Sequence, residues 1–322
     1  MKNILYILTF FVLFYSHSQT KTNDSLNYQY FKIDNNLTYI YKKPKIWDTF
    51  KYIPRDYIDF GKYLIQKEHL PQVGVAIVST AALIPVDRKL LDNASKIGSK
   101  IGWDKEGEYL YINGVRMLPA DTSSAVYHIG NGGTTLLLSA GFLIYGKIHN
   151  DYRALNTSSE LAEILISVGL VSQTLKRITG RQSPVRAIQS GSDSGHWTPF
   201  PSFKSFKENT PNYDAMPSGH LATYVASLFV ISTNYPEKKW IKPVGYTLGG
   251  LLAFKMVSSK VHWTSDYPIA ILIGYAMGKN AANRRIKKEN TIKLGKTNYR
   301  YKINYNLSQL DNSLIGGVRI SF

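Results

Sequence analysis

Cysteine is absent from this chain of 322 residues. The absence excludes disulfide bonds, thiolate catalysis, cysteine-ligated zinc and a lipid-anchored N-terminal cysteine. The seven histidines show no spacing typical of metal ligands, so we expect no metal site. A Gly-x-Ser-x-Gly turn is also missing, which argues against a serine-based acyl transferase.

Long apolar runs are scarce after the first 18 residues. Most uninterrupted runs span about 12 to 16 residues, whereas a helix across a bilayer needs about 20. This favours a compact helical bundle over a polytopic membrane protein. At the start of the chain, Lys2 precedes a short apolar core at 4–15 and small residues at 16–18. We predict a signal peptide over 1–18 and export to the periplasm or cell envelope, with membrane association or insertion left open.

Acidic residues are few. The chain has 22 Asp and Glu against 39 Lys and Arg, which gives a formal net charge of +17. Such an excess favours acidic partners, either a phosphorylated substrate or an anionic membrane surface. Because no nucleic-acid-binding motif accompanies the charge, we expect no nucleic-acid partner.

The apolar pattern predicts an all-α protein built around a bundle of about six helices. A polar N-terminal extension with one or two helices covers 19–125, and the core covers 126–285. At 286–322 we expect a basic turn and a β-hairpin, because apolar and polar residues alternate there. The six expected helices are 70–86, 129–148, 159–176, 219–232, 241–257 and 266–280.

A Pro-Ser-Gly-His sequence at 217–220 begins one of these helices. Ser218 is a good helix N-cap, and Gly219 lets a ligand approach the backbone closely. The N–H groups and partial positive charge of a helix start suit an anion such as phosphate. His220 is placed to exchange a proton with whatever binds there.

Two further stretches flank this motif in sequence. Downstream, His262 and Asp266 are four residues apart, so one helical turn brings them together. A carboxylate on one imidazole nitrogen fixes the tautomer and leaves the other nitrogen free to act. Upstream, a basic run over 175–186 contains Lys176 and ends an apolar segment.

The order of these three motifs resembles the type 2 phosphatidic acid phosphatase superfamily. That superfamily also includes bacterial acid phosphatases and vanadium haloperoxidases, and its signature is Lys-x6-Arg-Pro, Pro-Ser-Gly-His and Ser-Arg-x5-His-x3-Asp. The resemblance covers about residues 130–282, roughly half the chain. It implies a helical bundle and cofactor-free hydrolysis of a phosphomonoester or pyrophosphate. The expected substrate is a lipid phosphate or a small phosphoester.

The resemblance also assigns roles to individual residues. His262 attacks phosphorus and forms a phosphohistidine, while Asp266 orients it and stabilises its positive charge. His220 protonates the leaving oxygen and later activates water. The phosphoryl oxygens are held by Lys176, Ser218 and Gly219.

Two arginines of the signature are missing, because Ser183 and Met256 occupy their positions. We expect a neighbouring basic residue to compensate, in the order Arg181, Arg186 and Lys255. Two alternatives remain open: a non-catalytic phosphate or lipid head-group binder with a degenerate site, and a vanadium-dependent haloperoxidase. Between the first two motifs, the long loop 187–216 is interpreted as a lid, with His196, Trp197 and Phe203 near the substrate.

Overall fold

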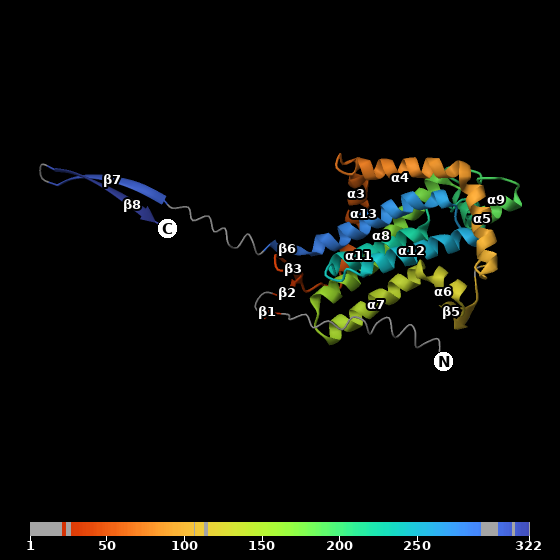
Figure 1. The fold of residues 1–322 in the computed structure, drawn as a ribbon, viewed down its shortest axis with the longest axis horizontal. Helices are drawn as coiled ribbons and strands as arrows, with labels where there is room; N and C mark the ends of the chain where they lie inside the picture. The colour runs from red at the N-terminus through yellow and green to blue at the C-terminus, as the bar shows by residue number, and fades with distance from the viewer. Residues whose placement is uncertain are drawn as a thin grey trace.

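The computed structural model describes residues 21–23, 27–105, 107–112, 115–290, 302–310 and 313–321. The predicted signal peptide lies outside these residues. The described chain is mostly helical, and its longest helices run in the same general direction along an elongated bundle (Figure 1). The all-α prediction is therefore confirmed.

The centre of the bundle is α11, which packs most extensively on α13. Small residues let these two helices approach closely. A Cβ atom added to Gly274 would lie 2.5 Å from the carbonyl oxygen of Ala222, and one added to Gly278 would lie 2.4 Å from that of Ala226. This contact joins the helix that follows Ser218 to the helix that follows Asp266. The six apolar helices are α4 (Leu70–Leu83), α7 (Gly132–Ile148), α8 (Tyr152–Thr179), α11 (Gly219–Asn234), α12 (Ile241–Ser258) and α13 (Tyr267–Arg285).

The segment 19–125, for which one or two helices are expected, contains more helix than that. Besides α4 and the four-residue α2 (Asp48–Lys51), it forms α3 (Ile53–Ile65) and α5 (Asp87–Lys100). In α3, Asp56 is buried because it accepts a hydrogen bond of 2.5 Å from Arg284 of α13. A long-range ion pair thus docks a helix whose sequence looks polar. The shorter helices are α6 (Thr122–Ile129), α9 (Pro184–Gln189) and α10 (Phe203–Glu208), with 3₁₀ turns η2 (Ile84–Val86), η3 (Thr210–Asn212) and η4 (Thr264–Asp266).

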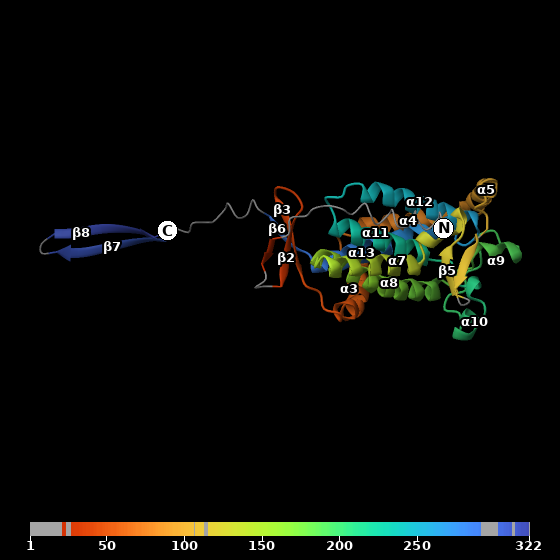
Figure 2. The ribbon, with the colours of Figure 1, turned by 90° about the horizontal axis from the view of Figure 1, so that it is seen from below.

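A small antiparallel sheet closes one end of the bundle, opposite to α5, α9 and α10 (Figure 2). Its strand order is β1 (Lys21–Asn23), β2 (Tyr28–Lys32), β3 (Leu37–Lys42) and β6 (Lys287–Asn290). Part of the expected basic turn is therefore the strand β6, which pairs with β3 near the start of the chain. Two further hairpins are β4 (Tyr109–Ile112) with β5 (Val115–Pro119), and β7 (Lys302–Leu310) with β8 (Ser313–Ser321). The last confirms the predicted terminal hairpin.

Two described helical stretches, 70–100 and 152–179, are long and apolar enough to cross a membrane. The second is largely a core element, since 67% of its apolar window is buried, against 17% for the first. On α4, Val75, Ile77 and Val78 point outward and are more than half exposed. The outer face of α4 is therefore an apolar surface that the rest of the described chain leaves uncovered.

Candidate functional site

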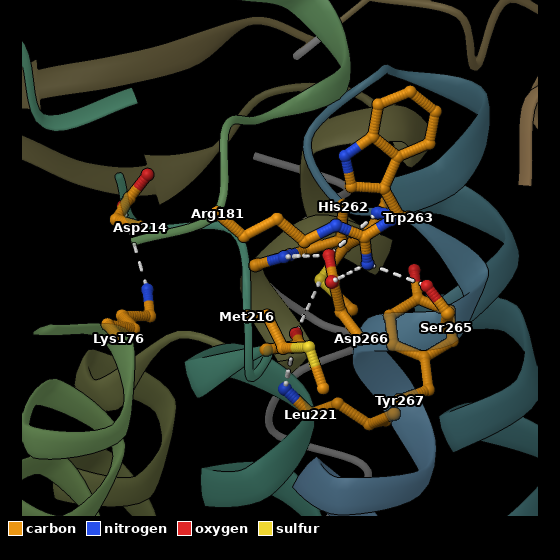
Figure 3. A network of polar contacts seen from close by, with 12 residues as sticks. Lys176, Arg181, Asp214, Met216, Leu221, His262, Trp263, Ser265, Asp266 and Tyr267 are labelled. Atoms are coloured by element: carbon orange, nitrogen blue, oxygen red, sulfur yellow. Dashed lines mark hydrogen bonds and ion pairs between the residues drawn. The ribbon is translucent and has the colours of Figure 1, made fainter. Parts of the chain in front are cut away.

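The three sequence motifs meet at the end of the bundle that carries α5 and α9. Lys176 lies in the last turn of α8, His220 in the first turn of α11, and His262 just before η4. The rings of His220 and His262 have their centroids 6.3 Å apart. The two motif histidines therefore lie side by side at this end of the bundle. Figure 3 shows Lys176 on one side of this region and the His262–Asp266 pair on the other.

His262 and Asp266 form the expected pair. Nδ1 of His262 lies 3.3 Å from Oδ2 of Asp266, and both side chains are buried. The same Oδ2 accepts a 2.8 Å hydrogen bond from the backbone N–H of Trp263, which fixes the carboxylate within its turn. An ionised carboxylate on Nδ1 favours the proton at that atom. Nε2 is then the nitrogen with a lone pair for attack.

His220 faces this pair from the start of α11, with the Tyr127 ring 4.8 Å away, centroid to centroid. Burial, together with the smaller effects of the nearby His262 and Lys176, lowers the pKa of His220 to about 3. His220 is therefore neutral at pH 7. A phosphate anion beside it would favour the protonated form, so that substrate and proton arrive together.

The lowered pKa of His220 predicts a pH dependence of stability. The unfolded chain takes up a proton on this histidine below about pH 6.5, whereas the folded chain does not until about pH 3. The stability that His220 contributes is thus full above pH 6.5 and is lost as the pH falls. Between pH 6 and 4, the free energy of unfolding measured with urea should fall less steeply in His220→Gln than in the wild type. The two slopes should differ by up to about 1.4 kcal/mol per pH unit. His149→Gln, at an exposed histidine, is the control, and parallel curves for wild type and His220→Gln would refute the linkage.

Ser218 and Gly219, the predicted phosphate-binding residues of the second motif, have different surroundings. Ser218 caps α11, since its Oγ accepts a 3.4 Å hydrogen bond from the N–H of Leu221, and it also lies 3.9 Å from Sδ of Met256. Gly219 leaves open space: a Cβ added there would meet no atom closer than Nζ of Lys176, at 4.0 Å. Lys176 and the backbone at Gly219 therefore border the same pocket.

An acidic residue that the motifs do not contain shares this pocket. Oδ2 of Asp214 lies 3.5 Å from Nζ of Lys176 (Figure 3). Asp214 also forms an isolated β-bridge with Arg181, which places the loop before the second motif beside the first motif. No sequence pattern marks Asp214, because its contacts come from a different helix. An incoming phosphate must compete with this carboxylate for Lys176.

Replacing Asp214 should therefore strengthen anion binding. We expect Asp214→Asn to lower the Kd for inorganic phosphate about 3- to 10-fold, because Lys176 loses its competing partner and the pocket loses a negative charge. Isothermal titration calorimetry measures the change. Asp193→Asn, at an exposed position of the preceding loop, should leave the Kd unchanged. An equal or higher Kd in Asp214→Asn would contradict the competition.

The positions of the two missing arginines are both buried. Met256 is fully buried, and its sulfur contacts the Ser218 hydroxyl. Ser183 is 5% exposed, and its Oγ finds no hydrogen-bond partner within the described part of the chain. The pocket therefore has an apolar thioether and a small hydroxyl where the superfamily signature has two guanidinium groups.

The three expected compensating residues have different surroundings. Arg181 is fully buried and donates from Nη1 to Oδ1 of Asp266, at 2.6 Å, so it lies behind the histidine pair. Lys255 is buried too, but its ammonium donates to two backbone carbonyls, that of Trp103 at 3.0 Å and that of Lys105. Arg186 is exposed, and it donates a 2.9 Å hydrogen bond to Gln189 on its own helix. Arg181 alone is tied directly to the histidine pair.

The expected lid is an ordered loop that contains α10. Trp197 stacks on the Arg181 guanidinium at 4.9 Å, and Phe203 stacks on that of Arg177 at 4.0 Å. His196 is exposed, and its backbone carbonyl accepts from the N–H of Gln182 at 2.9 Å. The loop thus packs along the first motif. A contact with substrate by these three side chains remains a prediction.

Within the described residues, no group of three or more His, Asp or Glu side chains is arranged to hold a metal ion. A cavity of about 200 Å³ lies at the other end of α11, lined by Ser232, Tyr235, Pro236, Lys238, Lys239 and Lys242. It contains none of the motif residues. The cavity is therefore separate from the site that the three motifs form.

The three motifs lie within a part of the chain that is similar to a known protein family. The PAP2 superfamily matches residues 159–287, which include all three motifs. No curated protein and no solved structure matches the chain. Proteins of the PAP2 superfamily generally hydrolyse phosphate esters. The resemblance inferred from the motifs is thus confirmed over residues 159–287, the part of the chain that matches this superfamily.

Proposed function

We propose that the protein is a metal-independent phosphatase that hydrolyses a phosphomonoester or pyrophosphate through a phosphohistidine. One observation carries the proposal: His262 is held at Nδ1 by a buried carboxylate, while a second, neutral histidine faces it across 6.3 Å. One imidazole is thereby prepared as a nucleophile and the other as a proton carrier.

In the first step, Nε2 of His262 forms a bond to phosphorus as the bond from phosphorus to the leaving oxygen breaks. Protonated His220 gives its proton to that oxygen. The proton on Nδ1 of His262 stays on the ring and is donated in a hydrogen bond to Asp266, whose carboxylate stabilises the positive charge on the phosphorylated ring. In the second step, neutral His220 takes a proton from water. The hydroxide then displaces His262 from phosphorus, and inorganic phosphate leaves.

The oxygens of the transferring group need donors, because phosphoryl transfer depends mainly on positioning and charge stabilisation. Lys176 supplies an ammonium group, and the backbone N–H groups at the start of α11 supply the helix N-terminus. Arg181 acts on the same site indirectly, through Asp266. This set contains fewer direct cationic contacts than the superfamily signature provides.

A second function is supported by that difference. Met256 and Ser183 remove two guanidinium groups, and Asp214 adds a carboxylate that pairs with Lys176. A site with this charge balance could bind phosphate or a lipid head group without turning it over. Arg186 and Lys255 stay candidates for phosphate contacts, although Lys255 would have to exchange its bonds to two carbonyls.

The proposed substrate is a lipid phosphate or a small phosphoester of the cell envelope. Support for a lipid comes from the exposed apolar face of α4 and from the net charge of +17, which favours an anionic membrane surface. Exposed Phe200 and Phe203 add apolar surface on the loop that packs along the first motif. Export and membrane association belong to the same proposal.

The test is phosphate release by the purified chain from lipid and soluble phosphates in the presence of a metal chelator. We expect release from at least one class without added metal. If no substrate is hydrolysed but phosphate binds, the binding-only function is favoured. Bromide oxidation with vanadate and hydrogen peroxide would instead support the haloperoxidase alternative.

A further inference from the structure

A carboxylate from outside residues 159–287 contacts residues of the first and third motifs, close to His262. Asp87 is the first residue of α5, and its side chain is fully buried. Oδ2 accepts from Nη2 of Arg181 at 2.7 Å and from Oγ of Ser265 at 2.5 Å, while Oδ1 accepts from the N–H of Ser265 at 3.0 Å. Asp87 thus binds one residue of the first motif and one residue within the His-x3-Asp sequence of the third.

Arg181 connects Asp87 to Asp266. Its Nη1 donates to Oδ1 of Asp266 and to Oγ of Ser265, both at 2.6 Å (Figure 3). The rings of Trp197 and Trp263 lie 4.9 and 5.3 Å from the guanidinium carbon. With this side chain fully buried, its position is determined by the two carboxylates and the two indoles.

The charges of this group explain why a second carboxylate is needed. A single guanidinium paired with Asp266 alone would neutralise the carboxylate that supports His262. Because Arg181 is shared with Asp87, the three side chains together carry a net charge of −1. That charge lies within the low-dielectric interior, where it can stabilise the positive charge that the proposed phosphorylation places on the His262 ring.

We propose that Asp87 is a positioning residue for this site. It fixes Arg181 and Ser265, so that Asp266 keeps Oδ2 on Nδ1 of His262, and it balances the charge of Arg181. Asp87 does not touch the pocket between the histidines. The kinetic consequence rests on the proposed phosphatase function, but the orientation of His262 can be measured without any turnover.

Kinetics separate this role from substrate binding. We expect Asp87→Asn to lower kcat about 10- to 100-fold with KM changed by less than about 3-fold, as for other residues that orient an active group indirectly. Asp92→Asn is the matched control: it lies on the same helix, is half-exposed and pairs only with Arg88 in the described contacts. The control should retain wild-type kcat and KM. Wild-type kcat in a folded Asp87→Asn protein would overturn the proposal.

The spectroscopic test uses ¹⁵N-histidine-labelled protein, with the His262 signals assigned by His262→Gln. We expect wild-type His262 to carry its neutral-state proton on Nδ1, and Asp87→Asn to show a mixture of both tautomers. An unchanged Nδ1–H tautomer in Asp87→Asn would contradict the proposal. A loss of thermal stability without a change of tautomer would indicate a purely structural role, and would also contradict the proposal. If wild-type protein hydrolyses no phosphate, the proposed function fails, yet the tautomer still decides the role of Asp87.

A second variant covers the case in which Asp87→Asn does not fold. Ser265→Ala keeps both ion pairs of Arg181 but removes the hydroxyl that links Asp87 and Arg181. We expect the tautomer of His262 to become mixed and kcat to fall about 3- to 10-fold. An unchanged tautomer and an unchanged kcat in Ser265→Ala would overturn the proposal.

Discussion

His262→Ala should lower phosphate release by at least about 1,000-fold, because the variant lacks the imidazole that is proposed to attack phosphorus. His220→Ala should behave differently. Its nucleophile and the Asp266 contact remain, so a substrate with a good leaving group can still phosphorylate His262. Water is then poorly activated, and the phosphorylated enzyme should accumulate. A rapid-quench experiment with p-nitrophenyl phosphate measures both steps.

His149→Ala is the control for these two variants, since this histidine is exposed at the end of α7. It should retain wild-type rates of nitrophenol and phosphate release. Full phosphate release by His262→Ala would refute the assignment of the nucleophile. Equal rates of both steps in His220→Ala and wild type would refute the role of His220 as acid and base.

Arg181→Met should destabilise the fold by about 3–5 kcal/mol, the range measured when one partner of a buried ion pair is removed. The side chain of Arg181 is fully buried, and it contacts two buried carboxylates at 2.6 and 2.7 Å. Without the guanidinium, Asp87 and Asp266 would repel each other within the core. Urea unfolding at pH 7 measures the loss.

The double variant Arg181→Met with Asp87→Asn should recover part of that stability, because only one uncompensated carboxylate then remains. Arg186→Met is the matched control, since Arg186 is exposed and pairs with Gln189. It should change the free energy of unfolding by less than about 0.5 kcal/mol. A wild-type unfolding midpoint for Arg181→Met would contradict the buried network.

The parts of the site that are local in sequence could be predicted. The N-cap at Ser218 and the contact between His262 and Asp266 depend on residues three or four positions apart, whose geometry a helix or turn fixes. The six apolar helices follow from composition in the same way. Asp87 and Asp214 could not be found, since their partners lie 94 and 38 residues away in the chain.

Lys255 shows that a basic residue one position away from a motif residue need not face the same site. Successive residues on a helix point about 100° apart, so a residue one position out of register faces a different direction. Met256 faces Ser218, and Lys255 accordingly directs its ammonium to the carbonyls of Trp103 and Lys105. The nearest basic residue in sequence is thus not the nearest in space. Arg181 also shows that a cation close to the site can act on the histidine pair instead of facing the pocket.

The proposed mechanism requires a covalent bond between phosphorus and Nε2 of His262. It is tested most directly by mass spectrometry of the His220→Ala protein, quenched in alkali after reaction with p-nitrophenyl phosphate, because phosphohistidine survives alkali and is lost in acid. We expect a single added phosphoryl group on His262 of the His220→Ala protein, and none on the double variant His220→Ala/His262→Ala. Two results would contradict this mechanism, provided that the wild type releases phosphate. One is phosphorylation at a residue other than His262, and the other is the absence of phosphorylated His220→Ala protein.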